Sequence, residues 1–502
     1  MSCKEQHGPV SRRRFLARFG AGTVALVAGF DLVARQWVTE AVAADTADST
    51  SFAAAPSLDG TLTFDPEAIA ANSHDQGNIV FRTPCAVLRP GSVQDIRKMV
   101  AFCASHNIKV APVGAHHAMF GQPLVSGGLI IEMQSLNTIH SIGTDGADVD
   151  TGVLWQDVIE AAYAQGLTPA SITSYIRTTV GGTLSMGGIG MMSAYRVGAQ
   201  VDHARLLQVV TGTGQLKWCS ATQNSELFEA TLAGLGQCGV ITRATIDLVP
   251  AKQRARTYRI GYADIPTFFQ DIRILANRGE FDSLGSIPQP GTAQPLVLWA
   301  TVFYDPGDVP DGSHLLRGLS PAAGAAPFED YGYLDYISLV TNLYDSFAAN
   351  LDWDAKVKPW SDLFLPDGAV EDFVESVFPS LTPEDLGPTG FGLIFPMLRS
   401  SYGRPLLRLP SGASGPWVWL VSVLTDSVES GPDPDFASRM MDRNYSLYQQ
   451  AAAVGGVRYP HGATPFTQAD WQAHYGSLWT QFVTWKNRYD PNGILTPGPG
   501  IF

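Results

Sequence analysis

The chain has 502 residues, of which 45% are hydrophobic and 16% charged, and its formal net charge is −14 at pH 7. At about 150 residues per domain this length allows two or three compact units, and the apolar share excludes an intrinsically disordered chain. The 50 glycines and 33 prolines follow no period, which excludes collagen-like and solenoid folds, and the acidic balance argues against nucleic-acid binding.

The N-terminus has the features of an export signal. Residues 11–16 (SRRRFL) form a twin-arginine pattern, followed by an apolar run over 19–30 and a small-x-small cleavage site at 41–43. The run is too short to span a bilayer, and no later apolar stretch reaches about 18 residues, so we predict no stable membrane insertion. We expect the twin-arginine translocase to recognise residues 1–43 and the mature protein to be periplasmic or extracellular in a bacterium.

A β-α-β pattern follows a polar lead-in. Residues 86–88 are a short apolar strand, and apolar residues at helical spacing predict a helix from about 92 to 103. The next strand, 109–113, runs directly into Gly114-Ala115-His116-His117. A strand that ends in such a loop can point backbone N–H groups at a ligand.

Further along, the pattern predicts a helix over 153–163 and a glycine-rich loop over 178–190. Residues 206–219 are typical of a hairpin, 225–235 of a helix and 240–246 of an alternating strand. After Pro250 the character changes to aromatic-rich strands, such as 296–304 and 417–424, separated by Pro/Gly-rich loops. This change predicts a separate, cap-like domain.

The two glycine-rich loops carry the main chemical signal. Glycine lets the backbone approach a pyrophosphate closely and donate N–H groups to it. Neither loop has the Rossmann or the P-loop spacing. From spacing alone, tight turns without a ligand explain the glycines equally well.

Other chemistries find less support. His116-His117 could be locally hydrogen-bonded residues, or one of them could tether a cofactor. The remaining histidines are scattered and no Cys-x-x-Cys is present, so we predict no metal site and no disulfide framework. No Gly-x-Ser-x-Gly elbow surrounds Ser185, which argues against a serine hydrolase.

Several motifs, in order, resemble those of cytokinin dehydrogenases, which belong to the FAD-linked oxidases of vanillyl-alcohol oxidase type. Residues 112–122 (PVGAHHAMFGQ) resemble the flavin-attachment loop, and 179–185 (TVGGTLS) resemble the second flavin loop. Residues 235–244 (LGQCGVITRA) resemble the stretch that closes the flavin site, and 358–366 (KPWSDLFLP) a substrate-domain signature. With the C-terminal run over 459–502, the resemblance covers about 80–502.

The resemblance implies an α+β fold. It consists of a two-subdomain FAD-binding domain of vanillyl-alcohol oxidase type and an α+β substrate (cap) domain with an antiparallel sheet. The expected boundaries are a signal peptide at 1–43, a lead-in at 44–75, the FAD-binding domain at 76–250, the substrate domain at 251–450, and a C-terminal segment at 451–502 that returns to the FAD-binding domain.

The same resemblance implies covalently bound FAD. His117 aligns with the histidine that bonds to the flavin 8α-methyl group, and such a bond should raise the flavin's reduction potential. No cysteine lies in the second loop, so a second, cysteinyl link is not expected. The residues expected to bind the cofactor are Val113, Gly114, Ala115, His116, His117, Ala118, Gln122, Thr179, Gly181, Gly182, Ser185, Gly188, Gly239 and Ile241.

The chain departs from the family pattern at four positions. His116 stands where the family usually has glycine, and Ala118 where it usually has serine. Ser174 and Gly285 stand where it has acidic residues that meet the substrate amine. A serine hydroxyl is no base near neutral pH.

The residues proposed for catalysis are therefore Ser174, Asp282 and Trp360, the last aligned with a pocket aromatic. Candidates for the base are Tyr175, Asp282 and His461.

The function that follows is oxidation of a CH–NH bond in a cytokinin-like amine by hydride transfer to covalent flavin, with oxygen or an electron carrier as acceptor. An alcohol (sugar, sterol or aromatic) is the alternative substrate. A degenerate flavin-binding protein without catalysis is an alternative of another class, because two acidic positions are lost. A secreted hydrolase would require a nucleophile that the sequence does not show.

Overall fold

The computed structural model describes residues 25–31, 36–42, 49–192, 194–288, 294–321, 326–411 and 415–502. The twin-arginine motif lies outside these residues. Within the expected signal segment, β1 (Ala25–Asp31) and β2 (Gln36–Val42) form an antiparallel pair. Among the helices described, we find none with the length and apolar character needed to cross a membrane.

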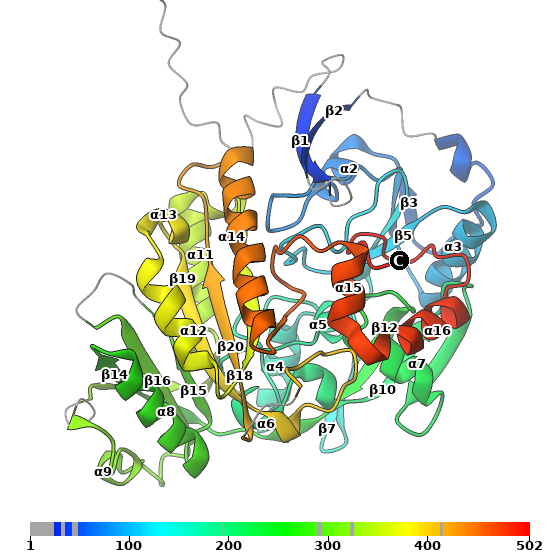
Figure 1. The fold of residues 1–502 in the computed structure, drawn as a ribbon. Coiled ribbons are helices and arrows are strands. Elements are labelled where there is room, and N and C mark those ends of the chain that lie inside the picture. Colours follow the sequence, from blue (N-terminus) through cyan, green and yellow to red (C-terminus); the bar gives the residue numbers. More distant parts are fainter. Residues whose placement is uncertain are drawn as a thin grey trace, which may run out of the picture.

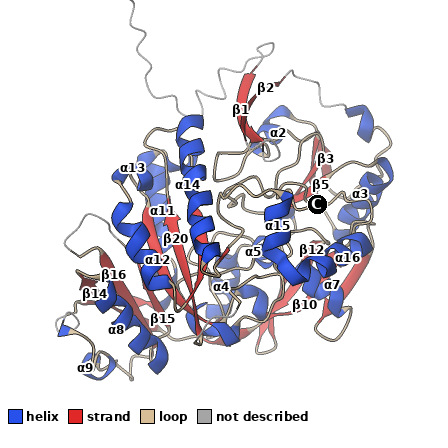
Figure 2. Cartoon of the chain, viewed as in Figure 1, coloured by secondary structure: helices blue, strands red, loops and turns tan. Residues whose placement is uncertain are grey.

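Two lobes lie side by side (Figure 1), and Figure 2 shows that both mix helices with sheets, as the expected α+β class requires. The first lobe carries a four-stranded and a five-stranded sheet, and the second an eight-stranded antiparallel sheet. The C-terminal helices α15 (Gln468–Tyr475) and α16 (Trp479–Tyr489) lie against the first lobe.

The four-stranded sheet has the order β3 (Thr61–Thr63), β4 (Ala86–Arg89), β6 (Leu129–Glu132), β5 (Val110–Val113). The predicted β-α-β unit is present: α3 (Val93–His106) joins β4 to β5, and β6 lies between these strands, parallel to both. The C-terminus extends this sheet, because the backbone of Val110 exchanges hydrogen bonds with Ile494 and Thr496, each 2.8 Å long. The end of the chain is thereby fixed beside the strand that leads to His117.

The five-stranded sheet has the order β11 (Leu216–Ser220), β10 (Ala204–Val210), β12 (Val240–Ile246), β8 (Gly146–Asp150), β7 (Ile139–Gly143). The predicted hairpin and alternating strand are both found here. The predicted helices also form, as α4 (Trp155–Tyr163) and as α7 (Ser225–Thr231), which is shorter than expected. A short antiparallel pair, β9 (Leu167–Pro169) with β13 (Leu248–Pro250), completes the lobe's strands.

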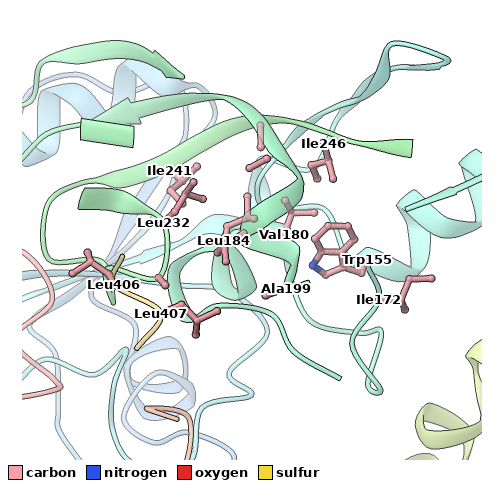
Figure 3. Close-up of a cluster of buried hydrophobic side chains, with 14 of the residues drawn as sticks. Trp155, Ile172, Val180, Leu184, Ala199, Leu232, Ile241, Ile246, Leu406 and Leu407 are labelled. Carbon is pink, nitrogen blue, oxygen red and sulfur yellow. The ribbon is translucent and has the colours of Figure 1, made fainter. Parts of the chain in front are cut away.

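The prediction of a loop over 178–190 was wrong in part, since residues 180–186 form helix α5 (Val180–Met186). The low helix propensity of its glycines favours a loop, but capping and packing stabilise the helix. Thr179 caps the helix through its Oγ1, which accepts the Gly182 N–H at 3.3 Å. Val180 and Leu184, four residues apart, are both fully buried. Figure 3 shows them among the side chains beneath the sheet, with Trp155 and Ile241.

The second lobe's sheet has the order β17 (Phe328–Gly332), β14 (Arg254–Tyr262), β16 (Leu296–Tyr304), β15 (Ser283–Ser286), β19 (Phe391–Leu398), β20 (Trp417–Leu424), β18 (Ser361–Pro366), β21 (Val457–Arg458). Its longer helices are α8 (Ile265–Arg278), α11 (Leu339–Leu351), α12 (Val370–Val377) and α14 (Pro434–Ala453). The shorter helices of the chain are α2 (Pro66–Ala71), α6 (Ala194–Val197), α9 (Gly312–Leu315), α10 (Tyr333–Ile337) and α13 (Pro383–Leu386).

The lobes share a core. The largest buried apolar cluster contains Trp155 and Leu184 of the first lobe together with Phe395 and Leu420 of the second. Burying one continuous apolar surface from both lobes is favourable, so it holds them in a fixed relation around the cavity between them.

Candidate active site

A large cavity lies where the lobes meet and contains about 1590 Å³ of space free of protein atoms, counting the part open to solvent. The first lobe contributes the loop 112–118, the residues 173–175, parts of α5 and the stretch 235–241. The second lobe contributes mainly apolar and aromatic side chains, namely Val340, Tyr344, Trp360, Leu393, Phe395, Leu420 and Leu424. One half is thus rich in glycine backbone and the other in apolar side chains.

The structure brings nearly all the residues singled out from the sequence to this cavity. Each of the fourteen expected cofactor-binding residues lines it, from Val113 to Ile241, and so do Ser174, Tyr175, Trp360 and His461. Asp282 does not belong to the described lining. Its Oδ2 instead accepts the Phe303 N–H at 2.6 Å, on the second lobe's sheet. The structure therefore separates Asp282 from the other residues proposed for catalysis.

The loop that carries His117 is shaped by close packing at Gly114. A Cβ at Gly114 would lie 2.0 Å from the Thr179 Oγ1, so only glycine lets this loop approach the start of α5. His116 has a φ of 55°, in the left-handed region. That conformation costs about 1 kcal/mol for a residue with a Cβ. This cost is a physical reason why the family that the chain resembles usually has glycine at this position.

A second segment, residues 75–77, holds the loop of His117 through hydrogen bonds. The N–H groups of Gln76 and Gly77 donate to the carbonyls of His116 and Ala118, at 2.9 and 3.2 Å. The Asp75 carboxylate accepts the N–H groups of Gly121, at 2.5 Å, and of Gly77, at 3.2 Å. These bonds fix the backbone on both sides of His117.

Asp75 and Lys358 are buried ionisable groups for which the sequence predicted no role. The Lys358 Nζ donates to the carbonyls of Gln76, at 2.9 Å, and Lys356, at 2.8 Å. The backbone N–H of Lys358 donates to the Gly77 carbonyl. Burial raises the pKa of Asp75 to about 7 and lowers that of Lys358 to about 7. No short-range sequence pattern marks this pair, because 283 positions separate its members. Lys358 thereby joins the second lobe to residues 76 and 77, which hold the loop of His117.

The His117 ring is enclosed by aromatic rings. It stacks on Tyr175 with centroids 4.5 Å apart and meets the edge of Trp360 at 6.0 Å. Burial, with the nearby His461 and Lys358, lowers the pKa of His117 to about 3. The imidazole is therefore neutral at neutral pH, and one ring nitrogen keeps a free electron pair for bonding to carbon.

A carboxylate and an imidazole meet in the cavity wall. Asp362 is the only Asp, Glu, Lys or Arg in the described lining, and its Oδ2 lies 3.4 Å from the His461 Nδ1. The His461 Nε2 lies 3.1 Å from the His117 carbonyl, to which it can only donate. A neutral His461 would then turn the lone pair of Nδ1 toward the carboxylate. Without a proton, the Nδ1 of His461 and the Oδ2 of Asp362 face each other as two acceptors. With one proton between them, they form a charge-assisted hydrogen bond.

The second glycine-rich segment offers no nucleophile. The Ser185 hydroxyl donates to the Gly181 carbonyl at 2.8 Å. The Gly181 N–H donates to the Thr151 carbonyl, also at 2.8 Å.

No group of three or more His, Cys, Asp or Glu suited to a metal ion occurs among the described residues. Cys103, Cys219 and Cys238 are buried free thiols.

The residues fit a flavin dinucleotide. Glycines 114, 181, 182, 188 and 239 keep side chains out of one half of the cavity, which suits close approach of a pyrophosphate to backbone. The apolar half suits a flat ring system and its substrate. The neutral His117 lies between them, three positions after Gly114 in the chain and against Trp360 in space.

Comparison with known proteins agrees with this description. A family model described as "FAD binding domain" matches residues 84–220, and one described as "Cytokinin dehydrogenase 1, FAD and cytokinin binding" matches residues 311–502. The chain is 35% identical to an uncharacterised oxidoreductase of the fasciation locus of Rhodococcoides fascians, over 84% of this chain and 95% of that protein. It is 30% identical to cytokinin dehydrogenase 2 of Arabidopsis thaliana (89% and 94% covered) and 31% identical to cytokinin dehydrogenase 1 of Oryza sativa subsp. japonica (88% and 92%).

Proposed function

Because this chain belongs to the family of FAD-dependent oxidoreductases that includes the cytokinin dehydrogenases, we propose that it oxidises a CH–NH bond of a cytokinin-like amine. The observation that carries the proposal is the position of His117, between the glycine-rich and the aromatic halves of one cavity. FAD bound there would supply the hydride acceptor, and oxygen or an electron carrier would take the electrons onward.

His117 is the residue we propose to hold the flavin covalently. Its neutral ring, its place in the cavity wall and the bonds that fix its loop all favour bond formation at one ring nitrogen. The carbonyl of His117 is also engaged, since it accepts from His461 Nε2. Protein contacts thus hold the loop on both sides of His117.

His461 and Asp362 are the groups that would accept the substrate's N–H proton. They lie beside His117, and together they take one proton at the His461 Nδ1. The Ser422 hydroxyl donates to the Asp362 Oδ1 at 2.6 Å and orients the carboxylate. Tyr175 is a poor base at neutral pH, because burial raises the pKa of its phenol. Ser174 is a poor base as well, and its Oγ accepts the Met191 N–H at 3.2 Å.

An alcohol is the second candidate substrate, because Ser174 does not restrict the site to amines. The resembling family has at this position an aspartate that meets the substrate amine, whereas a serine hydroxyl can hydrogen-bond to an alcohol or an amine alike. The His461–Asp362 pair could take a hydroxyl proton in the same way. Anaerobic mixing with panels of amines and alcohols decides between the two, because only a substrate bleaches the flavin absorbance. A protein whose flavin no compound bleaches would be a flavin-binding protein without catalysis.

We also propose that the protein is exported in the folded state through the twin-arginine translocase and acts in the periplasm or outside the cell. Residues 11–16 support this location. A translocase that carries folded proteins suits an enzyme whose cofactor is inserted before export.

A further inference from the structure

Lys358 is a fully buried lysine of the second lobe that bonds to a segment of the first. Its Nζ donates to the Gln76 carbonyl at 2.9 Å, and its backbone N–H donates to the Gly77 carbonyl at 2.8 Å. The ring of Trp353 packs against the ammonium group, with its centroid 4.7 Å from Nζ. Lys358 thus holds both carbonyl groups of the segment 76–77.

The peptide unit between Gln76 and Gly77 connects Lys358 to the loop of His117. Its carbonyl oxygen, from Gln76, accepts from the Lys358 Nζ, and its N–H, from Gly77, donates to the Ala118 carbonyl at 3.2 Å. Hydrogen bonds at the two ends of one peptide unit polarise it and strengthen each other. Donation from the Lys358 ammonium group therefore strengthens a contact one residue after His117.

The segment 76–77 lies close to the loop on both sides of His117. On the N-terminal side, the Gln76 N–H donates to the His116 carbonyl at 2.9 Å. On the C-terminal side, a Cβ at Gly77 would lie 1.9 Å from the Met119 carbonyl oxygen, which shows how tightly the two backbones pack. A displaced segment would therefore move the His117 ring with it.

We propose that Lys358 is a positioning residue that aligns the His117 ring with the cavity through the segment 76–77. The inference rests on the proposed function, in which His117 holds the flavin, and it gives the second lobe a part in flavin attachment. The Trp360 N–H donates to the Lys358 carbonyl at 2.9 Å, and the Trp360 ring meets the His117 ring at 6.0 Å. Lys358 thus contacts the backbone that carries each of these two rings.

Lys356 offers a matched control, because it is also a buried lysine and lies two positions away. Its Nζ donates to the carbonyls of Ser427, at 2.8 Å, and Val428. These bonds stay within the second lobe. Lys356→Met therefore removes the same kind of contact as Lys358→Met without touching the segment 76–77.

The test follows amide hydrogen exchange by mass spectrometry on the purified full-length protein, in peptides that cover residues 74–79 and 114–121. We expect exchange to be about tenfold faster in Lys358→Met and unchanged in Lys356→Met, because only Lys358 bonds to this segment through a charged donor. The fraction of polypeptide that retains flavin after acid denaturation should fall about threefold or more in Lys358→Met, and should stay at the wild-type level in Lys356→Met.

Two further variants separate the loop contact from bound flavin and from folding. Adding Lys358→Met to His117→Ala, which lacks the proposed attachment point, should raise exchange by the same factor, because the contact does not require flavin. If Lys358→Met does not fold, Lys358→Gln removes the charge and shortens the side chain, and the same two measurements apply.

Exchange that Lys358→Met leaves unchanged, or that Lys356→Met raises equally, would overturn the inference. Faster exchange with flavin retained at the wild-type level would overturn it too, since the loop would then be loosened without effect on His117. Both results leave the proposed function standing. A wild-type protein that binds no flavin would instead reject the proposed function and this inference with it.

Discussion

Asp362 and His461 face each other in the wall of the main cavity, with Oδ2 and Nδ1 3.4 Å apart, although 99 positions separate them in the chain. The contact joins β18 to the loop after β21, and the other ring nitrogen of His461 meets the His117 carbonyl. The groups able to take a substrate proton thus lie beside the residue proposed to hold the flavin.

Replacing Asp362 with Asn should lower kcat by about a hundredfold or more, because the pair then loses its charged proton acceptor. Flavin content should not change. Steady-state rates and flavin content check this, and an Asp362→Asn enzyme with wild-type turnover would exclude the pair from proton transfer.

Ser174→Ala should change kcat/KM by less than about tenfold for an amine substrate. The hydroxyl is no base near neutral pH, and among the described residues the hydrogen bond that the variant loses is the one from the Met191 N–H. Rates measured beside those of Asp362→Asn make the comparison direct. A loss from Ser174→Ala as large as that from Asp362→Asn would show that Ser174 takes part in the chemistry.

Asp75 should make the folded protein less stable as pH rises. Its pKa is raised from near 4 to about 7 in the folded state, so between these values the folded chain keeps a proton that the unfolded chain has lost. The free energy of unfolding should therefore fall as pH rises through this range, and fall less in Asp75→Asn. Denaturant titrations at several pH values measure both slopes. Parallel slopes in the two proteins would contradict this assignment.

Export should depend on the arginine pair. Changing Arg12 and Arg13 to lysine should keep the protein in the cytoplasm, because the charge is retained but the twin-arginine pattern is lost. Cell fractionation with an antibody to the mature chain provides the measurement. Equal amounts of the variant and the wild type outside the cytoplasm would argue for a different export route.

Local signals predicted much of the fold. The strands at 86–88, 240–246 and 296–304 and the helix that became α3 follow from periodicity, which is a property of neighbouring residues. Helix α5 did not follow, because Thr179 capping and burial of Val180 and Leu184 outweigh the glycines' low helix propensity.

The residues of the candidate site also differ in whether the sequence alone indicates them. The two glycine-rich segments and His117 are marked by motifs that can be read along the chain. Asp362 and Asp75 matter through contacts between distant segments, and no spacing in the sequence indicates these contacts. For Asp282 the sequence was misleading. The residue lies close in sequence to the aligned position, Gly285, but its side chain does not line the cavity.

The most direct test of the account is the flavin itself, measured on the purified protein after acid denaturation. We predict flavin absorbance that stays with the polypeptide and a flavin-bearing peptide modified at His117. His117→Ala should release the flavin, whereas His116→Gly, which relaxes a left-handed backbone, should retain it. A native protein without flavin absorbance that takes up no added FAD, or a flavin attached at His116, would contradict the account.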